Sequence, residues 1–149
     1  MTYDFLRTNG PPWILRSRDI SAYKKVEGSL IGDGSKMKTL DSFYAEISKN
    51  LEFPTHFGRN FNALYDMLTD MTWLQRDIYV LLVDNGRQTL SGEPLSALEG
   101  FLDCLNSVSE TWSRAISIGA DWDRAEVPFH TLFQFAEGGG HLPDSQFYR

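Results

Sequence analysis

Apolar and polar positions along the chain follow two periods, and these periods predict its secondary structure. Between Thr39 and Pro54, apolar side chains recur every three or four residues, the spacing of one buried face of a helix that Thr39 can cap. The same spacing predicts a second helix from about Asn60 to Met71 and a longer third helix within residues 91–112. These helices make up much of the central part of the chain.

Three other segments have the composition of β-strands. Within residues 77–85, an unbroken apolar run at 78–83 is bounded by Asp and by Asp-Asn, which is typical of a central parallel strand covered on both faces. A short strand around residues 28–31 precedes the turn signal Asp33-Gly34, and residues 127–135 form the last strand. Strands that alternate with helices imply parallel neighbours. We therefore predict an α/β fold in which a small three-stranded parallel sheet packs against helices.

The two ends of the chain carry weaker signals. Residues 1–25 begin with turn formers, and the apolar triplet at residues 13–15 could form an extra strand or a packed arm. We interpret residues 1–25 as an N-terminal extension and residues 26–136 as one domain. Residues 137–149 include three consecutive glycines and are expected to form a flexible tail.

Composition and charge narrow the class of function. Of the 149 residues, 42% are hydrophobic and 23% are charged, as in one ordered soluble domain. The net charge of −6 disfavours direct binding to nucleic acid or to anionic membranes and favours a cationic partner. The single cysteine, Cys104, excludes an internal disulfide, and it is predicted to be a small buried hydrophobe. Without an export signal or a long apolar run, the expected location is the cytoplasm.

The second helix separates its residues into two arcs. At about 100° per residue, one arc is apolar and the opposite arc is polar. The apolar arc contains Phe61, Leu64, Met67, Leu68 and Met71, and the polar arc contains Asn62, Tyr65, Asp66, Thr69 and Asp70. Like charges four residues apart, as in Asp66 and Asp70, cost an isolated helix about 0.2–0.5 kcal/mol. An arrangement that opposes stability points to a binding site, although a solvated face of an acidic protein explains it equally well.

Residues 30–69, read without gaps, carry an ordered series of short motifs. A strand and an Asp-Gly turn lead to a helix, then to Leu-x-x-Pro, two aromatic residues, Gly-x-Asn, Ala-Leu, and an aromatic residue followed by aspartate. This series resembles the barstar family, intracellular proteins that inhibit barnase-type ribonucleases. The resemblance implies a barstar-like layered fold for residues 26–136.

The resemblance also implies which residues meet the partner. In the family, the second helix and the loop before it enter the ribonuclease active site, and acidic side chains take the places of RNA phosphates. Asp66 matches the central carboxylate, and Asp70 and Asn62 are expected to flank it. The expected contact residues are completed by His56, Phe57, Gly58, Tyr65 and Met71.

The resulting prediction is an inhibitor of a basic ribonuclease, without enzymatic activity, cofactor or metal, and without contact to nucleic acid or membrane. One alternative is an immunity protein against another nuclease or toxin, because Asn62 stands where the family commonly has an aspartate. Another is an enzyme in which His56 and the paired carboxylates perform acid/base chemistry or hold Mg²⁺ or Ca²⁺. The chain lacks a metal motif, a phosphate-binding glycine loop and Gly-x-Ser-x-Gly, so the enzyme is disfavoured.

Overall fold

A four-stranded parallel sheet forms the centre of the protein. The computed structural model describes residues 4–135, so the predicted tail at residues 137–149 lies outside the described residues. The strand order is β1-β4-β3-β2, and all three neighbouring pairs are parallel. The strands are β1 (Ile14–Ser17), β2 (Leu30–Asp33), β3 (Tyr79–Asp84) and β4 (Phe129–Gln134).

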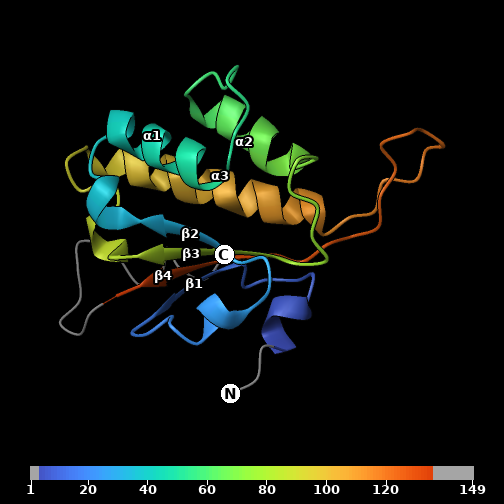
Figure 1. Ribbon diagram of the computed structural model, residues 1–149, viewed down its shortest axis with the longest axis horizontal. Coiled ribbons are helices and arrows are strands. Elements are labelled where there is room, and N and C mark those ends of the chain that lie inside the picture. The colour runs from blue at the N-terminus through green and yellow to red at the C-terminus, as the bar shows by residue number, and fades with distance from the viewer. Residues whose placement is uncertain (1–3, 136–149) are drawn as a thin grey trace.

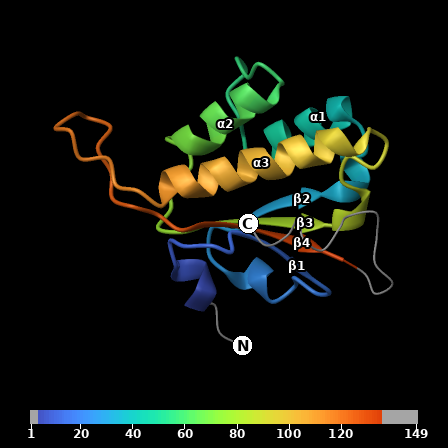
Figure 2. The ribbon, with the colours of Figure 1, turned by 180° about the vertical axis from the view of Figure 1, so that it is seen from behind.

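The α-helices cover one face of this sheet, and residues 4–29 outside β1, called the N-terminal segment below, cover the other (Figures 1 and 2). As predicted, Thr39 caps the first helix, because its hydroxyl accepts a hydrogen bond from the Ser42 amide at 3.2 Å. The third helix starts later than residue 91, directly after Pro94. The α-helices are α1 (Leu40–Asn50), α2 (Phe61–Asp70) and α3 (Leu95–Trp112), and the 3-10 turns are η1 (Asp4–Arg7), η2 (Tyr23–Lys25), η3 (Gly34–Lys36) and η4 (Gly86–Gln88).

The predicted α/β class is confirmed, but the sheet has four strands instead of three. The additional strand β1 pairs with β4, from Ile14 opposite Thr131 to Ser17 opposite Gln134. Of the two alternatives for the apolar triplet at residues 13–15, an extra strand or a packed arm, the structure shows the strand. It is short and half polar, so its pairing with β4 determines its conformation. The pairing moves β4 from an edge to the interior of the sheet. The division of the chain into an extension and a domain stays an interpretation.

Strand β3 is covered on both faces, as its apolar run predicts. Successive side chains of a strand point to opposite faces. Leu81 belongs to the large core beneath the helices, whereas Val80 packs in a smaller cluster with Leu6 and Ile20 of the N-terminal segment. The N-terminal segment therefore buries the second face of the sheet.

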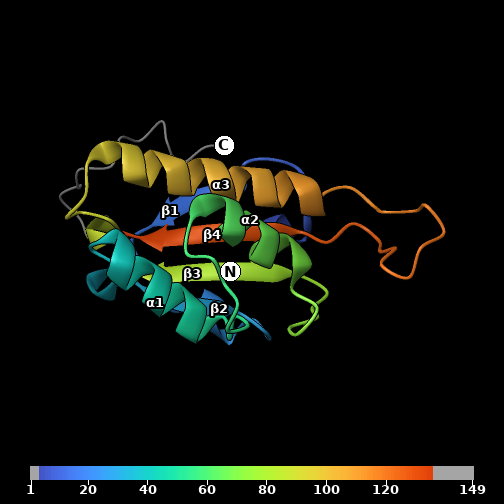
Figure 3. The ribbon, with the colours of Figure 1, turned by 90° about the horizontal axis from the view of Figure 1, so that it is seen from above.

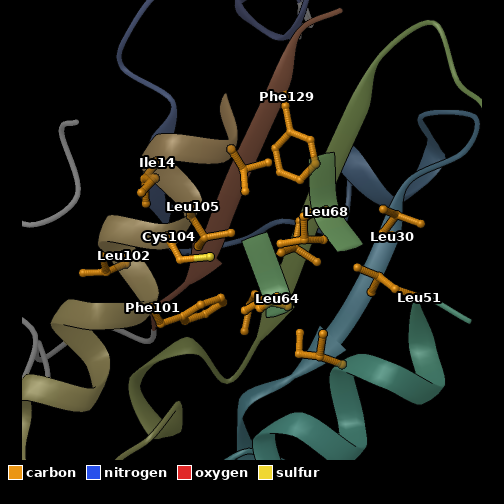
Figure 4. Packing of buried hydrophobic residues seen from close by; sticks show 14 of the residues in the cluster. Ile14, Leu30, Leu51, Leu64, Leu68, Phe101, Leu102, Cys104, Leu105 and Phe129 are labelled. Carbon is orange, nitrogen blue, oxygen red and sulfur yellow. The ribbon is translucent and has the colours of Figure 1, made fainter. Parts of the chain in front are cut away.

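Helix α2 is the outermost helix and rests on the layer formed by α1 and α3 (Figures 1 and 3). Its side chains Leu64 and Leu68 are fully buried, and Figure 4 shows Leu64 beside Phe101 of α3. A Cβ atom at Gly100 would lie only 2.8 Å from the ring of Phe61, so a glycine at this position lets α2 approach α3 closely. The apolar arc predicted for the second helix is the face that packs on the core.

Buried His130 on β4 predicts a loss of stability in mild acid. Its Nε2 atom lies 2.9 Å from the Thr8 carbonyl oxygen, under the N-terminal segment. Burial lowers its pKa below the ordinary 6.5, and the carbonyl groups of Thr8 and Pro12 oppose this only partly. The unfolded chain then binds the proton more readily than the folded protein does. The contribution of neutral His130 to the free energy of unfolding is therefore complete at a pH above the ordinary histidine pKa, and it declines as the pH falls below that value. Urea unfolding followed from neutral pH down to mild acid measures the decline.

His130→Gln provides the control for this pH dependence. The variant cannot take up the proton, so its free energy of unfolding is expected to change less over the same pH range. Identical pH profiles for the two proteins would contradict the assignment to His130.

Candidate functional site

Helix α2 is short, and both of its ends have defined hydrogen bonds. At the start, the Asn60 side-chain oxygen accepts a hydrogen bond from the Ala63 amide at 2.7 Å. At the end, Met71 adopts a left-handed conformation, with φ at 50°, and its amide donates to the Met67 carbonyl at 3.2 Å. These contacts satisfy backbone groups that a helix leaves open at its termini. The helix thus holds its side chains in fixed positions.

Substitution of Asn60 tests how much its cap stabilises helix α2. Asn60→Ala removes the acceptor of the Ala63 amide and is expected to lower the free energy of unfolding by about 0.5–2 kcal/mol. Asn60→Asp keeps an acceptor at the same place, so its stability should stay close to that of the parent protein. Chemical denaturation of the three proteins measures the difference. Equal losses in both variants would show that the cap does not determine the effect.

The outer side of α2 presents the predicted polar arc to solvent. Asn62, Asp66 and Asp70 are all exposed. Among the side chains that the structure describes, the ion pairs are Lys24–Asp84, Arg59–Asp41 and Arg114–Glu110. None of them includes a carboxylate of α2. The negative charge of Asp66 is therefore available to a cation from outside the protein, whereas that of Asp70 also acts on the nearby Arg124.

The loop before α2 is held against α1. Phe57 is half-buried, and its ring makes edge-to-face contacts with Phe53 at 5.0 Å and Tyr44 at 5.8 Å between centroids. Arg59 has a positive φ of 54° and donates a hydrogen bond to the Asp41 carbonyl at 2.9 Å. Phe57 therefore anchors the loop by packing.

Two further loop residues, His56 and Gly58, are exposed. His56 stands next to the packed Phe57 ring, so its imidazole is presented by a supported part of the loop. The positive backbone angle in this loop falls on Arg59, the residue after Gly58. A Cβ atom at Gly58 would lie 3.3 Å from the Ala63 Cβ, which is a tight contact with the first turn of α2.

The last two predicted contact residues, Tyr65 and Met71, differ in how far they are buried. Tyr65 is half-buried, and its hydroxyl forms a 2.6 Å hydrogen bond with Thr111 Oγ1 on α3, with part of the ring left at the surface. Met71 is 0% exposed and belongs to the core. A fully covered side chain offers a partner no contact area, so Met71 is corrected from a contact residue to a core residue.

A groove of about 450 Å³ follows the junction between α2 and α3. Asn62 and Tyr65 line it from α2, and the exposed acids Asp103 and Glu110 line it from α3. Sequence reasoning missed these two acids, because the register of α3 against α2 is a property of the tertiary structure. Their spacing on one face of an amphipathic helix is the signal that could have indicated them. They extend the acidic surface beyond α2.

The C-terminal end of α2 is fastened by residues that follow it in the chain. Arg124 donates a hydrogen bond to the Thr69 carbonyl at 2.8 Å, and its guanidinium lies 3.4 Å from the centre of the Trp112 ring. The Trp112 indole donates to the Leu68 carbonyl at 2.8 Å. Burial lowers the pKa of Arg124, and the negative charge of Asp70 is among the neighbours that partly oppose this. Two carbonyl groups in the last turn of α2 thereby gain partners.

Cys104 lines the groove between α2 and α3. Burial raises the pKa of the Cys104 thiol to about 12, so at neutral pH it is an unreactive thiol, in line with a small buried hydrophobe. Within residues 4–135, no group of three or more His, Cys, Asp or Glu residues is arranged to hold a metal ion. None of the helices in this range combines the length and apolar character that crossing a membrane requires.

Fold and site together define a class: a small parallel α/β protein whose outermost helix offers carboxylates on a supported surface. The family model for Barstar (barnase inhibitor) matches residues 29–134, which is more than half of the chain. The chain therefore belongs to the Barstar (barnase inhibitor) family, and the resemblance in residues 30–69 is confirmed. No curated protein matches the chain.

Proposed function

We propose that this protein inhibits a basic ribonuclease by placing the outer face of α2 and the preceding loop in the enzyme's active site. The observation that carries the proposal is the exposed Asp66 carboxylate, which takes part in none of the ion pairs among the described side chains. A ribonuclease active site holds arginine, lysine and histidine to bind a phosphodiester. A carboxylate can accept a bidentate, charge-assisted pair from such an arginine and so take the place of the phosphate.

The support behind α2 favours tight binding. Helix α2 is tied to α3 through Tyr65 and Thr111, and its last turn is held by the Trp112 indole and the Arg124 guanidinium. A surface that is already in its binding conformation loses little conformational entropy on association. The geometry therefore suits an inhibitor, because an inhibitor must bind the enzyme more tightly than the RNA substrate does.

The overall charge supports fast capture of a basic enzyme. The chain carries a net charge of −6, and opposite fields accelerate encounter between proteins. Association should then slow markedly as salt is added, because salt screens interactions between exposed charges.

The proposed role needs no catalysis and no cofactor, and it belongs to the cytoplasm, where an inhibitor of this family would protect the cell. The target can also be another nuclease or toxin, which would make the chain an immunity protein in a toxin–antitoxin pair. The exposed Asn62 favours this alternative, because the family commonly has an aspartate at that position and a different target would select a different side chain.

Inhibition of RNA cleavage tests the proposal directly. The pure protein is titrated into a panel of small basic ribonucleases that includes barnase, and cleavage of a fluorogenic RNA is followed. We expect a stoichiometric loss of cleavage for at least one enzyme. If no enzyme of the panel is inhibited, the proposal is wrong, and inhibition of a basic DNase would then support the immunity protein. Metal-dependent cleavage by the protein alone would support an enzyme instead.

A further inference from the structure

The segment between α3 and β4, residues 113–126, projects from the body of the protein (Figures 1 and 2). Its two arms are joined by backbone hydrogen bonds of 2.8 and 2.9 Å between Ile116 and Arg124. The Asp123 carboxylate accepts hydrogen bonds from the amides of Ile118 at 3.1 Å and Gly119 at 2.7 Å. These contacts brace the segment, so its tip has a defined conformation.

The tip of this segment exposes two large apolar side chains. Ile118 is 71% exposed and Trp122 is 67% exposed, more than any other large hydrophobic residue in the described part of the chain. A single exposed apolar residue is ordinary on a protein surface. Here two of them stand on one braced loop, and tryptophan is among the residues most enriched in the energetic centres of protein interfaces.

The segment adjoins the acidic face of α2. Arg124 ties it to the Thr69 carbonyl of α2. A hollow of about 570 Å³ is lined by Asp70 of α2 and by Asp121 and Trp122 of the segment. Figure 1 shows the segment rising from the end of α3 to the level of α2. A protein seated on the outer face of α2 would meet the segment at its side.

The charge at the tip has the same sign as that of α2. Asp121 and Asp123 precede and follow Trp122 in the sequence, and all three residues are exposed. The two arginines of the segment are engaged elsewhere, since Arg124 stacks on a buried ring and Arg114 pairs with Glu110 at 3.4 Å. The tip therefore combines an aromatic face with carboxylates, a combination that suits an arginine or lysine side chain through cation–π contact and charge.

We infer that residues 113–126 form a second contact for the same basic ribonuclease that α2 inhibits, an inference that rests on the proposed function. Trp122 and Ile118 anchor this contact, and a cationic side chain of the enzyme, outside its active site, lies against the Trp122 ring. The active-site contact of α2 recognises what basic ribonucleases share. The second contact meets a surface on which they differ, so it determines which of them are inhibited.

Binding measurements on matched variants test the inference. The dissociation constant is measured for the enzyme of the ribonuclease panel that the protein inhibits best, with parent protein, Trp122→Ala and Asp66→Ala. We expect Trp122→Ala to raise the dissociation constant by about 30-fold or more. Leu95→Ala is the control, because it truncates an exposed side chain, 45% accessible, at the opposite end of α3. Its effect should stay within about 2-fold.

Two further measurements separate contact from folding. Trp122 is largely exposed, so the unfolding midpoint of Trp122→Ala should equal that of the parent protein. Trp122→Phe keeps an aromatic face and should restore most of the affinity lost in Trp122→Ala. An affinity loss that persists in Trp122→Phe to the same extent would contradict the aromatic contact.

The outcomes distinguish this inference from the function on which it rests. If Asp66→Ala weakens binding and Trp122→Ala does not, the second contact is wrong and the proposed inhibitor function stands. If Trp122→Ala weakens binding and Asp66→Ala does not, the two surfaces do not act together, and the inference is wrong as stated. If the parent protein inhibits no ribonuclease of the panel, the proposed function fails and the second contact fails with it.

Discussion

Replacing Asp66 with alanine is expected to weaken binding to the target ribonuclease by about 2–5 kcal/mol, a range established in part on the barnase–barstar pair itself. This corresponds to a rise in the dissociation constant of roughly 30-fold to several thousand-fold. Most of the loss comes from the enzyme, whose cation would remain buried without a partner. Titration calorimetry, or inhibition of cleavage at varied inhibitor concentration, measures it.

The same substitution should leave the fold intact. Asp66 is exposed and forms none of the ion pairs among the described side chains. Removing one of two like charges on α2 even relieves a repulsion of about 0.2–0.5 kcal/mol. The matched control is Glu27→Ala, which removes the same charge from an exposed position of the N-terminal segment. A binding loss below about 1 kcal/mol, or an equal loss in the control, would place Asp66 at the rim of the interface.

Replacing Phe43 with alanine is expected to lower the free energy of unfolding by about 3–5 kcal/mol. Phe43 is fully buried on α1, and its ring lies 4.6 Å from Phe101 of α3 and 6.2 Å from Phe61, the first residue of α2, between centroids. Truncation removes these edge contacts and leaves a cavity between three helices. Urea unfolding measures the loss.

Two control variants define the origin of this loss. Phe43→Leu keeps most of the volume, so it should cost considerably less than the alanine variant. Trp122→Ala removes an aromatic side chain of similar size from an exposed site, so it should leave stability nearly unchanged. If Phe43→Ala costs less than about 1 kcal/mol, the three helices do not depend on this ring for their packing.

The features of the fold that the sequence predicted are those with a local signal. The two arcs of α2 follow from helical spacing, and the structure buries Leu64 and Leu68 while it exposes Asp66. The apolar run of β3 correctly predicted a strand with both faces covered. Strand β1 had a weaker signal: the apolar residues 13–15 allowed an extra strand or a packed arm, and only the pairing of Ile14–Ser17 with β4 decides for the strand.

The site was predicted less completely, because part of it depends on how distant segments meet. Met71 lies in the core, as its place on the apolar arc indicated, so its burial opposes the expected contact with a partner. Asp103 and Glu110 reach the groove only because α3 lies against α2. Trp122 belongs to a loop without periodicity, so the hollow that it lines together with Asp70 could be recognised only in the folded structure.

The N-terminal segment, which covers the second face of the sheet, restricts where this protein can be truncated. The family model begins at residue 29, so a fragment trimmed to that boundary loses β1 and the N-terminal segment. Its strand β4 would then offer open backbone groups along one side, and Val80 and Leu132 would lose the apolar side chains that shield them. Such a bare edge pairs readily with other chains. We therefore expect a fragment without these residues to aggregate more readily than the whole protein.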